Sequence, residues 1–342
     1  MMISKPVPQL SIIIPVYNTG EYLENSFNSI VKADEFNKDN VEIIFINDHS
    51  DEQTRQILNK FDFFDYVHVF NLKDNDPHGA GNARNMGMSI ASGKYYYFMD
   101  ADDKIKRNFF SIVFAQLNNT NYDVLTFGFE MVDSETGELL AKKIANLDNI
   151  IIRNENWEQN IFWYFDNVNV FSVWNKIYDA SFLKRNHLKF PNSRTAQDAL
   201  FNLKMLSCVT TIKVIKENLY MYLVGRPGSN QTISKSKFEN EFDVIMELKL
   251  LFKNFSNLNW QFIVYNQILE VLTREYKYAL SVNHNSVSKN LSNGENFYLL
   301  SKELNNYYKK NIIKIKIKNQ LRSIFFKNSM RINIMGWLDR HV

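Results

Sequence analysis

The chain has 342 residues, of which 45% are hydrophobic and 23% charged, as in a soluble globular protein with a large catalytic domain and an extension. One cysteine, Cys208, excludes a disulfide within the chain and fits a reducing compartment. The sequence has no uncharged apolar run of membrane-spanning length and no pattern of a signal peptide, so we expect a cytoplasmic protein.

The net charge of +3 is distributed unevenly. Residues 302–342 hold ten Lys and Arg against two acidic residues, a net of +8, which leaves −5 for residues 1–301. A near-neutral body therefore carries a basic tail. The acidic balance of the body and the lack of a recognition module argue against a nucleic-acid partner.

The first 130 residues alternate between strand and helix patterns, which predicts parallel strands joined by right-handed crossovers. The predicted strands cover residues 10–14, 41–46, 66–72, 95–99 and 122–131. The predicted helices cover residues 20–31, 50–61 and 79–91. We expect Pro15 to end the first strand, Ser50 and Gln53 to form a capping box, and residues 134–137 to form a hairpin turn.

After about residue 238 the pattern is helical, which predicts a catalytic domain over residues 1–235 and a helical region over residues 236–342. Residues 307–326 read as a basic amphipathic helix, although residues 312–318 also alternate as a strand would. Such a helix could contact an anionic membrane or the acceptor, or it could pack on the core or on another subunit.

Polar side chains follow three of the predicted strands: Asn18 the first, Asp48 the second, and Asp100 and Asp102 the fourth. Ligands of open parallel sheets bind at these strand ends. Two carboxylates so close would repel each other, and a hard divalent cation would remove that repulsion and leave positions open for phosphate oxygens. The spacing alone fits equally well a cap by Asp102 or Asp103 on a following helix.

Four segments resemble family 2 glycosyltransferases of the GT-A fold. They are Ser11-Ile-Ile-Ile-Pro-Val-Tyr-Asn18, Ile46-Asn-Asp-His-Ser-Asp51, Gly81-Asn-Ala-Arg-Asn-Met-Gly87 and Phe98-Met-Asp-Ala-Asp-Asp103. Their order and spacing make the match specific over roughly residues 8–230. The resemblance implies an α/β fold of the GT-A type, Rossmann-like, with a mostly parallel sheet flanked by helices and a C-terminal helical extension.

The resemblance also implies a donor site. Its nucleotide-sugar-binding residues would be Pro15, Tyr17, Asn18, Asp48, Arg84, Asp100 and Ala101. Tyr17 would lie near the base, Asp48 would accept a hydrogen bond from uracil, and Arg84 would lie over the base and the phosphates. Asp102 would bind Mn²⁺ or Mg²⁺ with help from Asp100. Taken singly, Tyr17 also fits a core position, Asp48 a turn and Arg84 a solvated helix face.

Three later segments extend the resemblance. Asp198 would be the catalytic base, although Gln197 stands where the family usually has Glu, and Asp198 also fits a helix cap. Trp174 and Lys176 could contact acceptor or phosphate, and an aromatic in the core beside a surface lysine is at least as good an explanation. Arg226 could neutralise the diphosphate from a loop or lie in an exposed turn.

Together these features predict an inverting, metal-dependent glycosyltransferase that moves a sugar from a UDP-sugar to a hydroxyl of a glycan or lipid-linked acceptor in surface polysaccharide synthesis, such as capsule. It could bind peripherally at the inner face of the plasma membrane through residues 302–342. The alternatives are a catalytically inactive protein that binds glycans or nucleotide sugars, and a sugar nucleotidyltransferase. The latter would carry a Gly-rich basic loop after the first strand, where this chain has Pro15-Val-Tyr-Asn18.

Overall fold

The computed structural model describes residues 7–118, 121–143, 150–153, 164, 168–192 and 197–226. The chain divides into two units, Met1–Gln231 and Thr232–Val342. The second unit lies outside the described residues, and with it the predicted C-terminal helices and the basic tail. Among the helices of the described part, none is both long and apolar enough to span a bilayer.

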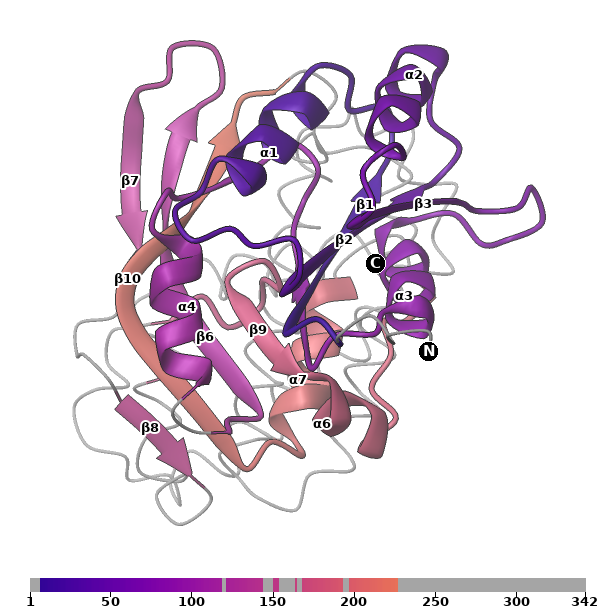
Figure 1. The fold of residues 1–342 in the computed structure, drawn as a ribbon. Coiled ribbons are helices and arrows are strands. Elements are labelled where there is room, and N and C mark those ends of the chain that lie inside the picture. Colours follow the sequence, from indigo (N-terminus) through magenta and orange to yellow (C-terminus); the bar gives the residue numbers. More distant parts are fainter. Residues whose placement is uncertain are drawn as a thin grey trace, which may run out of the picture. The chain divides into compact units, whose positions relative to one another are not determined.

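Strands and helices alternate along the first half of the described unit (Figure 1). The strands are β1 (Leu10–Val16), β2 (Val41–Asn47), β3 (Val67–Asn71), β4 (Tyr95–Phe98), β5 (Lys104–Ile105), β6 (Val124–Asp133), β7 (Leu139–Lys143), β8 (Ile150–Arg153), β9 (Lys176–Asp179) and β10 (Thr211–Val224). The helices are α1 (Tyr22–Val31), α2 (Glu52–Phe61), α3 (Ala80–Ile90), α4 (Phe109–Leu117), α6 (Ala180–Arg185) and α7 (Gln197–Leu206).

One ten-stranded sheet runs in the order β3-β2-β1-β4-β9-β6-β10-β5, with β7 paired to β6 and β8 to β10. The first four strands are parallel, as the alternating pattern predicts. Beyond β4 the sheet is mixed, because β9 is antiparallel to both β4 and β6 while β10 is parallel to β6. The chain order reverses between β1 and β4, which makes that crevice the switch point of the sheet.

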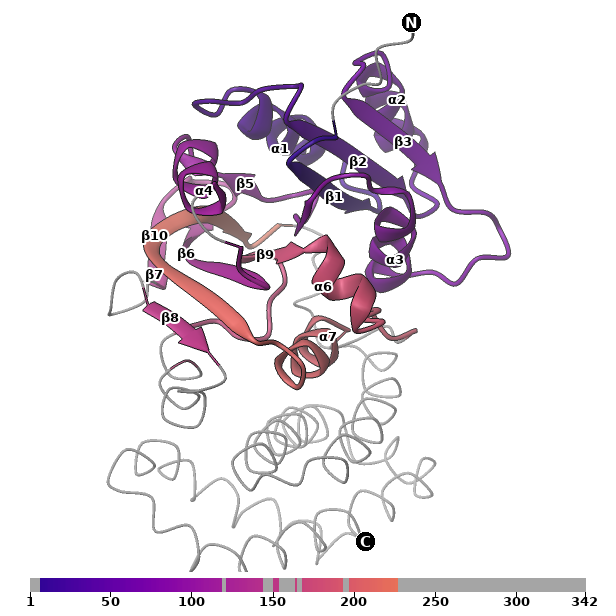
Figure 2. The ribbon, with the colours of Figure 1, turned by 60° about the horizontal axis from the view of Figure 1, so that its bottom comes forward.

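Helices cover both faces of the parallel strands (Figure 2). On one face, α1, α2 and α4 bury their apolar side chains in a core cluster with alternate residues of β1, from Leu10 to Val16. On the other face lies α3, where Gly87 approaches Ile13 so closely that an added Cβ would lie 2.3 Å from the Ile13 Cγ2. The buried strands thus read as continuous apolar runs because both of their faces are covered.

The core is rich in rings, as the aromatic content of 14% suggests. On the α1 face, Phe27 stacks on Phe61 with 4.1 Å between ring centroids. On the α3 face, Phe190 stacks on Phe201, also at 4.1 Å, and both lie edge-on to Phe98 at the end of β4. These contacts hold α7 against the strand that leads into Asp100.

Two local expectations are wrong. Pro15 lies inside β1 and pairs with Ile46 instead of ending the strand. The Val16 carbonyl accepts from the Asp48 N–H beyond β2, so the backbone groups of Val16 point toward β2 and those of Pro15 point toward β4. Pairing between β1 and β4 stops at Ile13 and Phe98, so no backbone N–H is needed at position 15. The cap of α2 is Asp51, whose side chain accepts from the Thr54 N–H, and not Ser50. The hairpin turn over residues 134–137 is confirmed, because β7 returns antiparallel to β6.

Candidate active site

Three parallel strands end at the same edge of the sheet. Register pairs Val16 at the end of β1 with Asn47 at the end of β2, and Ile13 with Phe98 at the end of β4. The next residues of each segment carry the predicted donor-site side chains. The sheet therefore brings them together on one rim at the switch point between β1 and β4.

Asp48 is a buried residue on this rim that contacts several neighbouring groups. Its backbone N–H donates to the Val16 carbonyl at 2.8 Å, and its Oδ2 accepts from the Gly79 N–H at 2.7 Å. Its Oδ1 lies 3.1 Å from the Nδ1 of His49 and 3.2 Å from the Nδ1 of His78. Asp48 thus fixes the loop before α3 against the end of β2, and it is more than a simple turn residue.

After β1, Asn18 makes hydrogen bonds within the protein and Tyr17 is exposed to solvent. Asn18 adopts a left-handed backbone with φ of 46°, and its Oδ1 accepts from the Asp51 N–H at 2.7 Å. The Ser50 hydroxyl accepts from the Asn18 N–H at 3.2 Å and donates to the Val16 carbonyl, so the two loops hold each other. Tyr17 is 61% exposed, which leaves its ring free to contact a ligand and excludes the core alternative.

Arg84 of α3 joins two carboxylates that lie far apart in the sequence. Its Nη2 donates to Asp100 at 2.7 Å and its Nη1 to Asp198 at 2.8 Å, while only 4% of the residue is exposed. The guanidinium also lies 5.3 Å from the centre of the Phe190 ring. The solvated-helix alternative for Arg84 is therefore wrong, and one side chain spans the end of β4 and the start of α7.

Asp198 stands in the first turn of α7, with 28% of its side chain exposed. Burial raises the pKa of its carboxyl above the usual range, and the Arg84 charge offsets only part of that rise. A carboxylate with a raised pKa that still reaches solvent is suited to accept a proton. Its neighbour Gln197 packs against α3, where an added Cβ on Gly81 would lie 2.7 Å from the Gln197 Oε1.

The three acids after β4 differ in their surroundings. Asp102 accepts from the Arg226 Nε at 2.5 Å, and burial followed by the charge of Asp100 raises the pKa of its carboxyl. Asp103 points inward and accepts from the Tyr220 hydroxyl at 2.6 Å and from the Leu223 N–H at 2.7 Å. It therefore anchors the loop to β10.

The helix-cap alternative for these acids is overturned. β5 follows them directly, and α4 begins only at Phe109, with Asn108 as its N-cap. Asp100 and Asp102 thus offer carboxylate oxygens on a half-buried loop, where the charge of Asp100 contributes to the raised pKa of Asp102. Each carboxylate pairs with an arginine, Asp100 with Arg84 and Asp102 with Arg226. Their remaining oxygens are ligands of the kind that a hard divalent cation prefers.

Trp174 and Lys176 lie in the interior. The Trp174 ring stacks on Tyr220 at 4.7 Å and is 6% exposed. The Lys176 ammonium donates to the Asn169 and Ser172 carbonyls and to the Asn175 side chain at 2.6–2.8 Å, and burial holds its pKa well below the usual range. The packing alternative fits Trp174, and Lys176 is not the surface lysine that this alternative supposed. Both side chains are buried, which leaves neither exposed to an acceptor or a phosphate in this structure.

Sequence reasoning did not single out His49, His78 or Tyr220. His49 follows Asp48 directly, and His78 stands between Pro77 and Gly79 in the turn before α3. A histidine beside a strand-end carboxylate, and another in a turn of the same half of the chain, were the available signals. Nothing local marked Tyr220, because its partners are 117 and 120 residues away.

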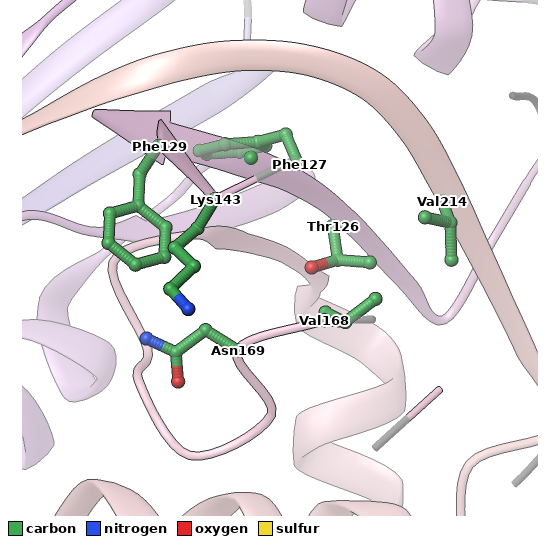
Figure 3. Close-up of a pocket in the computed structure, with 8 residues that line it drawn as sticks. Thr126, Phe127, Phe129, Lys143, Val168, Asn169 and Val214 are labelled. Atoms are coloured by element: carbon green, nitrogen blue, oxygen red, sulfur yellow. The ribbon is translucent and has the colours of Figure 1, made fainter. Parts of the chain in front are cut away.

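A small pocket lies away from this rim, between β6 and the segment around residue 168 (Figure 3). Its lining residues are Thr126, Phe127, Gly128, Phe129, Lys143, Val168, Asn169 and Val214. No carboxylate of the described residues lines it. We assign it no chemistry.

Relatives of this chain include bacterial glycosyltransferases. The chain is 26% identical over 278 residues to "Poly(ribitol-phosphate) beta-N-acetylglucosaminyltransferase TarS" of Staphylococcus aureus, covering 79% of this chain and 45% of that protein. It is 27% identical to "Glycosyltransferase GlyG" of Streptococcus pneumoniae, covering 67% of this chain and 74% of that protein. The chain thus spans less than half the length of TarS.

Solved structures agree on the fold. Residues 1–349 of S. aureus TarS align with a TM-score of 0.66 and 20% identity over 97% of this chain and 90% of that one. The same part of TarS has also been solved with UDP and with UDP-GlcNAc. PcManGT of Pyrobaculum calidifontis, a mannosyltransferase solved with GDP-Man and Mn²⁺, aligns with a TM-score of 0.53 at 12% identity over 96% of this chain and 86% of that one.

A family model settles the assignment. The model described as "Glycosyl transferase family 2" matches residues 11–186, slightly more than half of the chain. That range contains all four segments on which the sequence resemblance rests. With a GT-A type sheet and the predicted donor-site residues on the rim at its switch point, this chain belongs to glycosyl transferase family 2.

Proposed function

We propose that the protein is an inverting glycosyltransferase that transfers a sugar from a UDP-sugar to an acceptor hydroxyl, with Asp198 as the base. One observation carries the proposal: a single guanidinium, that of Arg84, holds Asp198 and Asp100 within one side chain's reach. The carboxylate that would accept the proton is thereby kept beside the loop after β4, where the sugar donor would bind. The UDP and UDP-GlcNAc complexes of TarS support a uridine donor by similarity.

The nucleotide would occupy the rim beside β1 and β2. The exposed Tyr17 ring offers a surface for the base, and Asp48 Oδ1 can accept from an imide N–H because its Oδ2 already has the Gly79 N–H. Asn18 holds the loop after β1 in shape, and Pro15 lies just before that loop, inside the strand. Asp100 and Ala101 come just after the end of β4, where the ribose and the sugar of the donor would lie.

Asp102 would hold the divalent cation, with Asp100 beside it. Such a cation supplies charge stabilisation to the leaving diphosphate. In the described residues Asp102 pairs with Arg226, so this arginine has to release the carboxylate or share it with the cation. Arg226 then remains next to the diphosphate and can balance part of its charge.

The transfer is a single displacement. The acceptor oxygen attacks the anomeric carbon, the bond from that carbon to the diphosphate oxygen breaks, and its electron pair stays on the diphosphate. Asp198 takes the acceptor's proton, a contribution of about 10²–10⁴ in rate. Attack from the face opposite the leaving group inverts the anomeric configuration.

Asp198→Asn tests the base. We expect transfer from UDP-sugars to fall by at least about a hundredfold, while UDP binding measured by calorimetry stays near that of the unchanged chain. Asp65→Asn, at a carboxylate 64% exposed on the surface, is the matched control and should change neither. Substantial transfer by Asp198→Asn would show that the base is assigned wrongly.

Asp102→Asn tests the cation. The variant keeps the shape of the side chain and removes its charge, so the stimulation of UDP binding by Mn²⁺ or Mg²⁺ should disappear. Stimulation equal to that of the unchanged chain would refute the role of Asp102. A screen of UDP-sugars with Mn²⁺, followed by mass spectrometry of the product, would identify the donor.

We further propose that the acceptor is a glycan or lipid-linked precursor of a cell-surface polymer, such as capsule. The description of TarS, which names poly(ribitol-phosphate), supports a polymer acceptor by similarity. Contact of residues 302–342 with anionic membranes at the cytoplasmic face stays a prediction, because those residues lie outside the described part. Flotation with liposomes, with and without residues 302–342, tests it. Absence of UDP release with every donor would favour the inactive binding protein instead.

A further inference from the structure

We propose that Asp48, His49 and His78 form a second metal site, which takes a zinc-type transition ion and excludes the donor nucleotide while the ion is bound. This cluster is separate from the Asp100–Asp102 loop. Each of its residues can offer one ligand atom so that the three atoms lie within 4.8 Å of one another. The exclusion of the nucleotide rests on the proposed role of Asp48 toward the base.

Two of the three distances between ligand atoms fit zinc. Bonds of about 2.0–2.1 Å in tetrahedral geometry place neighbouring ligand atoms roughly 3.3 Å apart. The Asp48 Oδ1 lies 3.1 Å from the His49 Nδ1 and 3.2 Å from the His78 Nδ1. One carboxylate and two imidazoles also form a ligand set that zinc accepts and that Mg²⁺, which prefers oxygen, does not.

The ligands are held in place by groups that a metal would not displace. The Gly79 N–H fixes Asp48 Oδ2, which leaves Oδ1 toward the two rings. The ring centroids of His49 and His78 lie 4.3 Å apart. His49 has a left-handed backbone with φ of 59°, which is uncommon for a residue other than glycine. The Nε2 of His49 is buried and has no hydrogen-bond partner among the described residues, and the carboxylate of Asp74 lies 3.9 Å away from it.

The cluster is open to solvent on one side. The side chain of Asp48 is 8% exposed, that of His49 23% and that of His78 53%, so an ion can arrive past His78. Three protein ligands leave a fourth position for water. In the alternative arrangement both imidazoles donate hydrogen bonds to Asp48 at the same distances, and the experiment has to separate the two.

Exclusion of the nucleotide follows from Asp48. Because Oδ2 is bound to the Gly79 N–H, a metal and an imide N–H would compete for Oδ1. Zinc at ten times its dissociation constant should therefore raise the apparent dissociation constant of UDP about elevenfold, as simple competition requires. A cell could in this way slow the enzyme when free zinc rises.

The first experiment titrates zinc chloride into the metal-free, untagged full chain in a calorimeter, without nucleotide. His49→Asn, which tolerates the left-handed backbone, and His78→Gln should each weaken zinc binding at least about tenfold, since even residues behind a ligand contribute that much. His68→Gln, a histidine of β3 with a 44% exposed side chain, is the matched control and should bind as the unchanged chain does. Equal zinc affinity in all four proteins would overturn the site and leave ordinary hydrogen bonds.

The second experiment titrates UDP with saturating Mg²⁺, with and without zinc. The zinc effect should be large in the unchanged chain and in His68→Gln, and small in His78→Gln. A zinc effect of equal size in His78→Gln would place the competing ion elsewhere and overturn the exclusion. If UDP does not bind even without zinc, the proposed function fails, while the zinc titration still decides the metal site.

Discussion

Replacing Arg84 by Met removes the guanidinium that serves two carboxylates at once. The side chain of Arg84 is 5% exposed, whereas those of Asp100 and Asp198 are 29% and 28% exposed. Removing one partner of a buried ion pair costs about 3–5 kcal/mol, and partial solvent access to both carboxylates lowers this. We expect Arg84→Met to lower the free energy of unfolding by about 2–3 kcal/mol.

Urea unfolding at pH 7, followed by circular dichroism, measures this loss. Arg107→Met is the matched control, because its pair with Asp34 has the same chemistry but Arg107 is 82% exposed, and its urea midpoint should stay close to that of the unchanged chain. In Arg84→Met/Asp198→Asn one stranded charge is gone, so the double variant should be more stable than the sum of the single losses by about 1 kcal/mol. Additivity within about 0.5 kcal/mol, or equal losses for Arg84 and Arg107, would refute the bridge as a source of stability.

Three further changes test other parts of the fold. Gly87→Ala should destabilise the chain by about 1–3 kcal/mol in urea, because its Cβ would lie 2.3 Å from the fully buried Ile13, and a loss under about 0.5 kcal/mol would show that α3 can shift. Asp51→Ala should cost about 1 kcal/mol by removing the α2 cap, whereas an unchanged midpoint would mean that the Asp51–Thr54 bond adds nothing. Burial raises the pKa of Glu130, but the hydrogen bonds from Lys106 and Lys142 outweigh burial and hold it below the usual range. The stability that Glu130 contributes is therefore complete above the unfolded pKa of about 4.3 and lost as pH falls through the lower folded pKa, so Glu130→Gln should cost about 1 kcal/mol at pH 7 and almost nothing at pH 2–3. A constant difference across that range would contradict this linkage.

Periodicity and strand-end chemistry predicted the parallel half of the sheet well. β1, β2 and β4 are short, apolar and covered on both faces, so their patterns needed no knowledge of distant partners. Pro15 shows the limit of local rules, because its place in β1 depends on where β4 stops pairing. The cap at Asp51 went unrecognised because Ser50 offered the same chemistry one residue earlier.

The site was predictable as a set of residues and not as a geometry. The sequence placed Asp48, Asp100 and Asp102 on one rim by strand order alone. It gave no means of seeing that Arg84 would bridge Asp100 and Asp198, which is 114 residues away. Nor did it show that the Lys176 ammonium would donate hydrogen bonds to three acceptors in the interior, because an ammonium is normally expected at the surface.

Tyr220 contacts residues of two other segments of the chain. Its ring lies against Trp174, its hydroxyl holds Asp103, and the same oxygen accepts from the Asp100 N–H at 3.3 Å. A change at any one of these positions leaves a gap or an unpaired buried group at another. Among descendants of a common ancestor, positions 103, 174 and 220 should therefore be replaced together or not at all, and the loop over residues 100–103 owes its tolerance to mutation to a tyrosine more than a hundred residues away.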